Sequence, residues 1–179
     1  MEEKHWYVLR DLKRPNSNTP AYLQLQQTEF HVDKVFTPMV VKEFVKNGRK
    51  VFKQVPFLCD LLFVYDTKSR LDDVVGRIPT LQFRFLRGGK QNTPMMVSDH
   101  DMNVFMGVVE KDVNVKYYKP EDVPESLYGK RVRIIGGTFD GLEGRLLSRR
   151  GSKRRQLLID LGTLLTASVE VEPEYIQEV

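Results

Sequence analysis

Hydrophobic residues follow two different periods along the first half of the chain. Alternating or continuous apolar runs, typical of β-strands, predict strands at 6–9, 34–46, 50–55, 57–65, 81–85 and 95–97. Apolar residues at helical spacing predict helices over residues 20–30, 68–77 and 99–109. Asn47-Gly48 separates two of the strands and is a strong signal for a hairpin turn. The order predicts an α+β sandwich, in which helices pack against a largely antiparallel sheet.

The chain changes character after the third predicted helix. Residues 110–126 have no apolar periodicity and contain two prolines, so they predict a linker. Short strands are then predicted at 131–135, 144–149, 156–161, 165–171 and 176–179. Short strands at this density favour a small SH3-like β-barrel. We therefore expect an amino-terminal domain at 1–110, a linker at 111–125 and a barrel at 126–179.

Glycines mark the turn between the first two strands of the expected barrel. Val132 and Ile134 alternate with arginines, the pattern of a half-buried strand. The alternation then ends at glycines that stand around Phe139, at positions 136, 137, 141 and 144. Glycine permits positive φ and close backbone approach, which the corners of a small barrel require. The residues alone leave open an ordinary glycine-rich hairpin.

This arrangement of an apolar strand, Gly-x-Phe-x-Gly and a further glycine resembles the KOW motif. Together with Trp6-Tyr-Val-Leu9 and the basic hairpin that precedes Phe57–Val64, it makes the chain similar to the NusG family of transcription elongation factors over nearly its whole length. The resemblance implies an NGN-type α/β sandwich with an antiparallel sheet, a linker and an SH3-like barrel with the KOW motif. Leu58-Cys-Asp-Leu61 departs from the family's Phe-Pro-Gly-Tyr-like turn, which suggests a specialised paralogue similar to RfaH or UpxY.

The resemblance also implies two docking surfaces. The first, on the amino-terminal domain, is expected to bind the clamp helices of RNA polymerase through Tyr7, Arg10, Phe57, Leu58 and Leu61. An exposed apolar patch usually marks a partner, although Leu58 and Leu61 would equally suit the core of a buried strand. The second surface is formed by barrel loops and is expected to engage Rho or a small-subunit ribosomal protein through Phe139, Leu142, Leu164 and Leu165. Phe139 could instead plug one end of the barrel.

Two basic hairpin tips are candidates for nucleic-acid contact. The segment 149–155 carries Arg149, Arg150, Lys153, Arg154 and Arg155 around a Gly-Ser turn. Such a cluster attracts phosphates, but it lacks the interleaved aromatics that stack on bases. The Asn47-Gly48 tip carries Lys46, Arg49 and Lys50 and would lie near upstream DNA in the family. For both tips, a solvated hairpin that aids solubility is an equal alternative.

Composition limits the remaining possibilities. A net charge of +4 permits nucleic acid as a partner without implying it. The chain has a lone Cys59, no signal-like start and no long apolar run, so we expect a cytoplasmic protein. No membrane partner is expected, and we expect the protein to be a monomer. Asp99-His-Asp101 is interpreted as a helix start rather than a metal or acid–base site. We expect no cofactor and no enzymatic activity; the alternatives are a ribosomal or RNA-binding KOW protein without polymerase contact, and a plain interaction adaptor.

Overall fold

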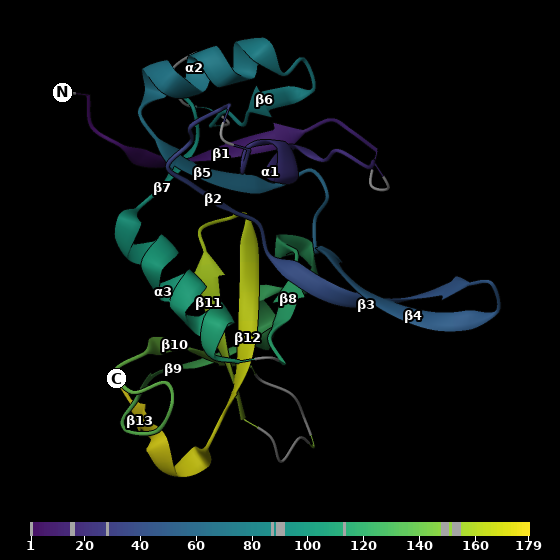
Figure 1. Cartoon of the computed structure of the whole chain (residues 1–179). Helices are drawn as coiled ribbons and strands as arrows, with labels where there is room; N and C mark the ends of the chain where they lie inside the picture. Colours follow the sequence, from purple (N-terminus) through teal and green to yellow (C-terminus); the bar gives the residue numbers. More distant parts are fainter. Residues whose placement is uncertain are drawn as a thin grey trace. The chain divides into compact units, whose positions relative to one another are not determined.

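The computed structural model describes residues 2–14, 17–27, 29–86, 88, 92–112, 114–147, 151 and 155–179. Their contacts form two compact units, Met1–Ser98 and Asp99–Val179 (Figure 1). Within the described ranges, no helix is long and apolar enough to cross a bilayer.

The first unit is organised around strand β1 (His5–Asp11), which contains the strand predicted at 6–9 and lies between β5 and β6 in the sheet. The sheet has the order β2 (Lys34–Phe36), β5 (Leu62–Asp66), β1, β6 (Leu81–Phe83), and β7 (Met96–Val97) also pairs with β1. All of these pairings are antiparallel. The predicted antiparallel sheet is therefore confirmed.

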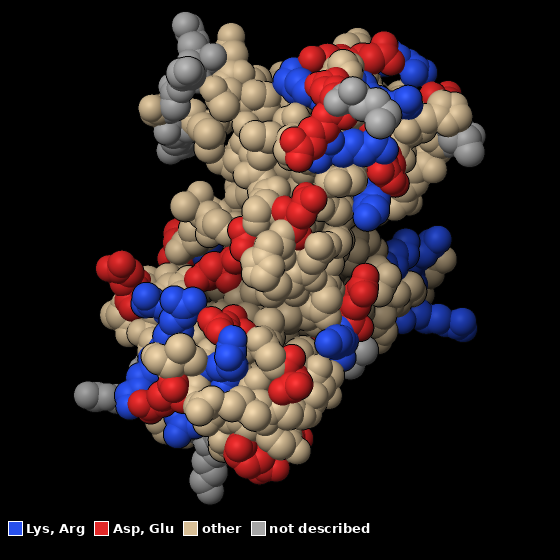
Figure 2. Space-filling model, turned by 90° about the vertical axis from the view of Figure 1, so that its left-hand side faces the viewer, with Lys and Arg blue, Asp and Glu red and all other residues tan. Residues whose placement is uncertain are grey.

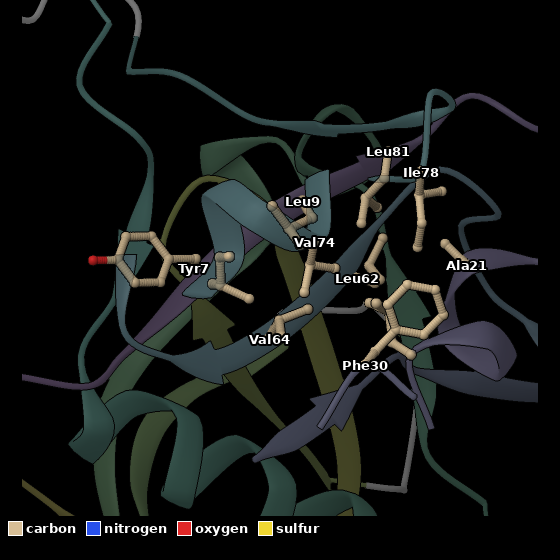
Figure 3. Packing of buried hydrophobic residues seen from close by; sticks show 11 residues of the cluster. Tyr7, Leu9, Ala21, Phe30, Leu62, Val64, Val74, Ile78 and Leu81 are labelled. Atoms are coloured by element: carbon tan, nitrogen blue, oxygen red, sulfur yellow. The ribbon is translucent and has the colours of Figure 1, made fainter. Parts of the chain in front are cut away.

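Helices α1 (Ala21–Gln24) and α2 (Lys68–Arg77) pack against this sheet. Their buried side chains join those of β1 and β5 in one cluster, which includes Tyr7, Leu9, Leu62, Val64 and Leu71 (Figure 3). Helix α2 has the predicted bounds, and its first turn is capped because the Thr67 side chain accepts a hydrogen bond from the Arg70 amide.

Helix α1 is much shorter than predicted, because the chain reaches the core by turns rather than by further helix. The amide of Gln27 donates to the Gln24 carbonyl, and that of Phe30 donates to the Gln27 carbonyl. These turns bring Phe30 into the core cluster. The start of α1 is fixed from a distance, since the Ala21 amide donates to Asp11 Oδ2 at 2.6 Å.

Strands β3 (Met39–Lys46) and β4 (Arg49–Pro56) form a separate two-stranded ribbon that extends away from the sheet of the first unit (Figure 1). Asn47 and Gly48 have φ of 52° and 73°, as a tight hairpin turn of this kind requires. The predicted hairpin is confirmed. The predicted continuous strand 34–46 is wrong, because the chain leaves the sheet at Pro38, which has no amide hydrogen to donate to a ladder.

The second unit begins with helix α3 (Asp99–Lys111) and continues as a six-stranded antiparallel sheet. Its strands in chain order are β8 (Lys116–Tyr118), β9 (Tyr128–Ile134), β10 (Glu143–Leu147), β11 (Arg155–Leu161), β12 (Leu165–Val171) and β13 (Ile176–Glu178), and their order in the sheet is β13-β9-β10-β11-β12-β8. Three short 3-10 helices (Pro120–Asp122, Glu125–Leu127 and Pro173–Tyr175) lie between strands. The predicted β-rich carboxy-terminal part, with few helices, is confirmed.

The core of the second unit is formed by one face of this sheet and by helix α3. The side chains of that face include Val132, Ile134, Leu157, Ile159, Leu161, Ala167 and Val169, all of them buried. On α3, Met102, Phe105 and Val108 are buried, and the helix contacts β11 and β12. The Phe105 ring also lies 6.3 Å from the ring of Tyr117 on β8. Helix α3 therefore packs within the second unit.

The segment expected to be a linker contains regular structure. Tyr117 pairs with Ala167 across the β8–β12 ladder and is buried. Sequence periodicity could not reveal a strand of three residues whose partner lies some fifty positions away. The contacts therefore divide the chain at Ser98, earlier than the expected boundary at residue 110.

Candidate functional site

The expected polymerase-binding residues divide into a buried and an accessible group. Leu61 is 2% exposed and Tyr7 is 5% exposed, so both side chains belong to the interior; for Leu61 the alternative of a core residue holds. Burial raises the pKa of Tyr7 above its ordinary value. Phe57 and Leu58 are partly exposed, and Arg10 is exposed. Only these last three of the five present accessible side-chain surface.

The predicted continuous strand 57–65 is interrupted by a turn before β5. The amide of Leu61 donates to the carbonyl of Leu58 at 3.3 Å, and the strand begins at Leu62. Asp60 lies in this turn with its Oδ2 atom 3.0 Å from Arg84 Nη2 and 3.5 Å from Arg10 Nε. The turn at Leu58–Leu61 is thus held by a carboxylate between two guanidinium groups.

The sequence analysis did not identify Arg84 and Asp60 as partners of Arg10 in an ion-pair cluster. Arg84 is adjacent to Arg10 because the Arg84 amide donates to the carbonyl of Val8 at 2.9 Å, which extends the β6–β1 ladder by one step. An acidic residue inside an apolar run was the available signal, since a carboxylate in such a place requires a partner. The sequence could not indicate which of the cations would supply it.

An exposed apolar group lies beyond the end of β6, next to Arg84. Phe85 forms a β-bridge with Pro94, and Met95 donates its amide to the Arg84 carbonyl at 2.7 Å. Phe85 is 49% exposed and Leu86 is 47% exposed, and Met96 on β7 is 50% exposed. The alternation at 81–85 predicted the strand, but it gave no indication that the side chains at the carboxy-terminal end of the strand would be exposed to solvent.

The glycine-rich loop between β9 and β10 is held by short hydrogen bonds from its backbone amides. The Gly136 amide donates to Asp140 Oδ1 at 2.6 Å, and the Gly141 amide donates to the Ile134 carbonyl at 2.8 Å. Gly136 and Gly137 have positive φ and lie under the Tyr175 ring, where a Cβ atom would be only 3.0 and 2.9 Å from ring carbons. Gly144 is a close-approach position, since its Cβ would lie 2.5 Å from the carbonyl oxygen of Leu158. The expected roles of these glycines are confirmed.

The loop and helix α3 together border a groove of about 250 Å³. Phe139 and Leu142 line one side, and Val104, Gly107 and Lys111 line the other. Lys111 Nζ donates to the Thr138 carbonyl at 3.4 Å. Two of the four expected loop residues thus border a cavity, whereas Leu165 is 1% exposed and pairs with Leu161 inside the sheet. Leu164 is partly exposed in the turn between β11 and β12.

The basic residues expected to contact nucleic acid differ in exposure and in pairing. Lys46 and Arg49 are exposed and lie opposite each other at the ribbon tip, but Lys50 is paired with Glu43 at 3.1 Å. Arg155 is exposed at the start of β11. Arg149, Arg150, Lys153 and Arg154 lie outside the described residues. On the face that Figure 2 shows, acidic and basic side chains are interspersed, without a large area of one sign.

The first turn of α3 contains Asp99 and Asp101, as expected for a helix start. Among the residues that the structure describes, no group of three or more His, Cys, Asp or Glu side chains could hold a metal ion. The described surface features are an exposed apolar group at the end of β6, a guanidinium–carboxylate cluster at Asp60, a groove beside Phe139 and a basic ribbon tip.

The chain thus has a mixed α/β unit followed by a β-rich unit, each with accessible surface features. A family model described as "Transcription termination factor nusG" matches residues 4–106, more than half of the chain, so the chain belongs to the NusG family. A solved structure described as "Domain interaction in Thermotoga maritima NusG" matches with a TM-score of 0.53 and 16% identity, covering 99% of this chain and 98% of that chain. At this identity the likeness concerns the fold. The search of curated proteins found no match.

Proposed function

We propose that the protein binds elongating RNA polymerase through its amino-terminal part. The family match over residues 4–106 carries the proposal, because it covers the unit with the exposed apolar group. Membership in the NusG family makes the protein a transcription elongation or antitermination factor. The contact with the clamp helices would use Phe57, Leu58 and Arg10, which keep accessible surface.

The mechanism proposed is one of bridging. A factor that spans the polymerase cleft holds the clamp closed and suppresses pausing, without any chemistry of its own. The second unit would recruit a further partner, Rho or a small-subunit ribosomal protein, at the groove beside Phe139 and Leu142. Linking two weak docking surfaces in one chain raises the effective concentration of the second partner at the polymerase.

The turn at Leu58–Leu61 supports a specialised role within the family. Its Asp60 carboxylate, held by Arg10 and Arg84, presents a charged cluster where the family pattern has an aromatic and glycine-containing turn. We propose a specialised paralogue similar to RfaH or UpxY, acting as a cytoplasmic monomer.

The proposal is tested by measuring the affinity of the full-length chain for core RNA polymerase by biolayer interferometry. Leu58→Asp places a charge in the proposed contact and should weaken binding by at least about tenfold, the effect of losing about 1.4 kcal/mol. Leu23→Asp, at an exposed apolar position on α1, is the matched control and should bind like the wild type. Circular dichroism verifies that both variants fold. No binding by the wild-type chain, or equal binding by the two variants, would refute the proposal.

The rival function is that of an RNA-binding KOW protein without polymerase contact. Arg131, Arg133 and Arg145 project from neighbouring strands of the second unit, but Glu143 pairs with Arg131 and Arg133 at 3.3 and 2.8 Å. This internal pairing lowers the charge available to phosphates. Filter binding with a structured RNA separates the two functions, because the rival predicts tight and salt-sensitive retention in the absence of polymerase.

A further inference from the structure

Arg10 and Arg84 project from the same face of the first sheet, opposite to helices α1 and α2. Side chains alternate along a strand, and Leu9 belongs to the core cluster that packs under the helices, so Arg10 points to the other side. The Arg84 amide donates to the Val8 carbonyl, which continues the register that pairs Leu9 with Phe83. Arg84 is therefore opposed to Val8 and lies on the face of Arg10.

The carboxylate between these arginines contacts both of them with a single oxygen. Asp60 Oδ2 lies 3.0 Å from Arg84 Nη2 and 3.5 Å from Arg10 Nε. The first distance is that of a hydrogen bond, whereas the second exceeds the usual range for one. Arg84 Nε is buried and has no hydrogen-bond partner. The Asp60–Arg84 pair thus falls short of the two parallel hydrogen bonds that an arginine and a carboxylate can form.

The cluster also has one positive charge in excess. Two guanidinium groups face one carboxylate, and among the described residues neither arginine has another ion-pair partner. The exposed fraction of the side chain falls from 53% for Arg10 to 43% for Asp60 and 30% for Arg84, so a second molecule reaches Arg10 most easily. An oxyanion that binds Arg10 would let Asp60 turn fully to Arg84 and accept hydrogen bonds from both Nε and Nη2.

The surroundings of the cluster favour a carboxylate of a protein over a phosphate of a nucleic acid as this oxyanion. Leu58 begins the turn that contains Asp60, Phe57 precedes it, and both are partly exposed. Apolar surface of this kind is matched by apolar side chains of a protein partner. A nucleic acid carries a charge on every phosphate, and its successive phosphates would be repelled by the Asp60 carboxylate. One excess positive charge is instead matched by one acidic side chain.

We propose that Arg10 binds a carboxylate of the protein that docks at Leu58, and that Asp60 competes for Arg10 until this partner displaces it toward Arg84. Arg10 recognises the partner, whereas Asp60 and Arg84 are positioning residues. The inference rests on the proposed function and deepens it, because it names the chemistry that the partner presents: an acidic side chain beside apolar ones. The internal competitor disfavours partners that lack a well-placed acid.

The test is the affinity of the full-length chain for core RNA polymerase, measured by biolayer interferometry at low and at high ionic strength. Arg10→Gln should weaken binding about tenfold at low ionic strength, because it removes a charge-assisted contact. Asp60→Asn should instead tighten binding about threefold, because it releases Arg10 from its competitor. Both effects should shrink at high ionic strength, which screens exposed charges. A purely structural role of Asp60 predicts weaker binding by its variant, so the sign of the change separates the two roles.

Asp73 and Arg77 on α2 supply matched controls. They form an exposed ion pair at 3.9 Å on the helix that packs against the opposite face of the sheet. Asp73→Asn and Arg77→Gln change the net charge as the two test variants do, and each should bind polymerase within about twofold of the wild type. Circular dichroism verifies that all four variants fold.

Three results would overturn the inference. Equal effects of the test variants and their α2 controls would indicate a response to net charge alone. Weaker binding by Asp60→Asn would contradict its role as a competitor. A loss of affinity of Arg10→Gln for a DNA duplex as large as its loss for polymerase would indicate phosphate as the ligand.

Failure of the proposed function has a different signature. It is refuted when the wild-type chain does not bind polymerase or when Leu58→Asp binds as tightly as its control. Weakened binding by Leu58→Asp, together with unchanged binding by Arg10→Gln, refutes the present inference alone.

Discussion

Asp60 and Arg84, which are separated by 24 positions in the chain, are joined by an ion pair of 3.0 Å between Oδ2 and Nη2. Arg10 approaches the same carboxylate oxygen at 3.5 Å. The pair connects the turn before β5 to the end of β6, across the central strand. The turn that carries Leu58 is therefore linked to β1 and to the end of β6 by these ion pairs.

Removal of the Asp60 charge should have a small effect on stability. Asp60→Asn leaves Arg10 and Arg84 next to each other without a counter-charge, but the Asp60 side chain is 43% exposed and solvent screens the interaction. We expect a decrease of up to about 1 kcal/mol in the free energy of unfolding, measured by urea denaturation. The decrease should shrink at high salt, and an effect independent of salt would argue against the ion pair as its cause.

Gly144 should tolerate no side chain. Gly144→Ala places a methyl group 2.5 Å from the Leu158 carbonyl, where β10 and β11 approach each other. We expect the free energy of unfolding, measured by urea denaturation, to fall by about 1–3 kcal/mol, because the strands must separate to relieve the overlap. Gly107→Ala is the matched control: it introduces the same methyl group in a helix with no atom within 4 Å of it and should stabilise by up to about 1 kcal/mol. A harmless Gly144→Ala variant would contradict the close approach.

The second unit should lose stability at high pH. Burial raises the pKa of Tyr117 to about 12, whereas an unfolded chain releases this proton near pH 10. Between these values the unfolded state binds fewer protons, so the free energy of unfolding falls as the pH rises through this window and is unaffected by the group below it. Tyr117→Phe should show a smaller fall between about pH 9 and about pH 11.5 in urea titrations. The neighbouring Tyr118→Phe serves as control, and identical pH profiles for all three proteins would exclude Tyr117 as the source.

Asp11 should matter for the position of α1. Its carboxylate accepts hydrogen bonds from the amides of Ala21 at 2.6 Å and Lys13 at 3.0 Å, and the residue is 4% exposed. Asp11→Ala leaves both amides without this acceptor. It should lower the free energy of unfolding, measured by urea denaturation, by about 1–3 kcal/mol. Hydrogen exchange at Ala21 should accelerate more than exchange at Leu71 on α2. Equal acceleration at both sites would indicate a general loss of stability instead.

Much of the fold could be predicted where local chemistry alone decides. The turn at Asn47-Gly48, helix α2 after its Thr67 cap and the glycine loop around Phe139 follow from preferences of a few adjacent residues. The prediction was wrong where tertiary contacts compete with pattern. Helix α1 ends early because turns bring Phe30 to the core, and β8 exists because β12 offers it an edge.

The candidate surfaces were predictable in part for the same reason. A leucine in an apolar run has the same sequence signal whether it is buried, like Leu61, or partly exposed, like Leu58. Charge pairing across strands depends on register, which placed Lys50 with Glu43 and away from Lys46. The Arg84–Asp60 pair required knowledge of how β6 extends along β1.

The pairing of β8 with β12 has a practical meaning for anyone who wishes to express the carboxy-terminal part by itself. A fragment that begins at residue 126 would lack β8 and α3, and would bare both the hydrogen-bonding edge of β12 and the apolar surface beneath Phe105. Unprotected strand edges of this kind recruit other chains and aggregate. A fragment that begins at Asp99 retains both coverings and should stay monodisperse in solution.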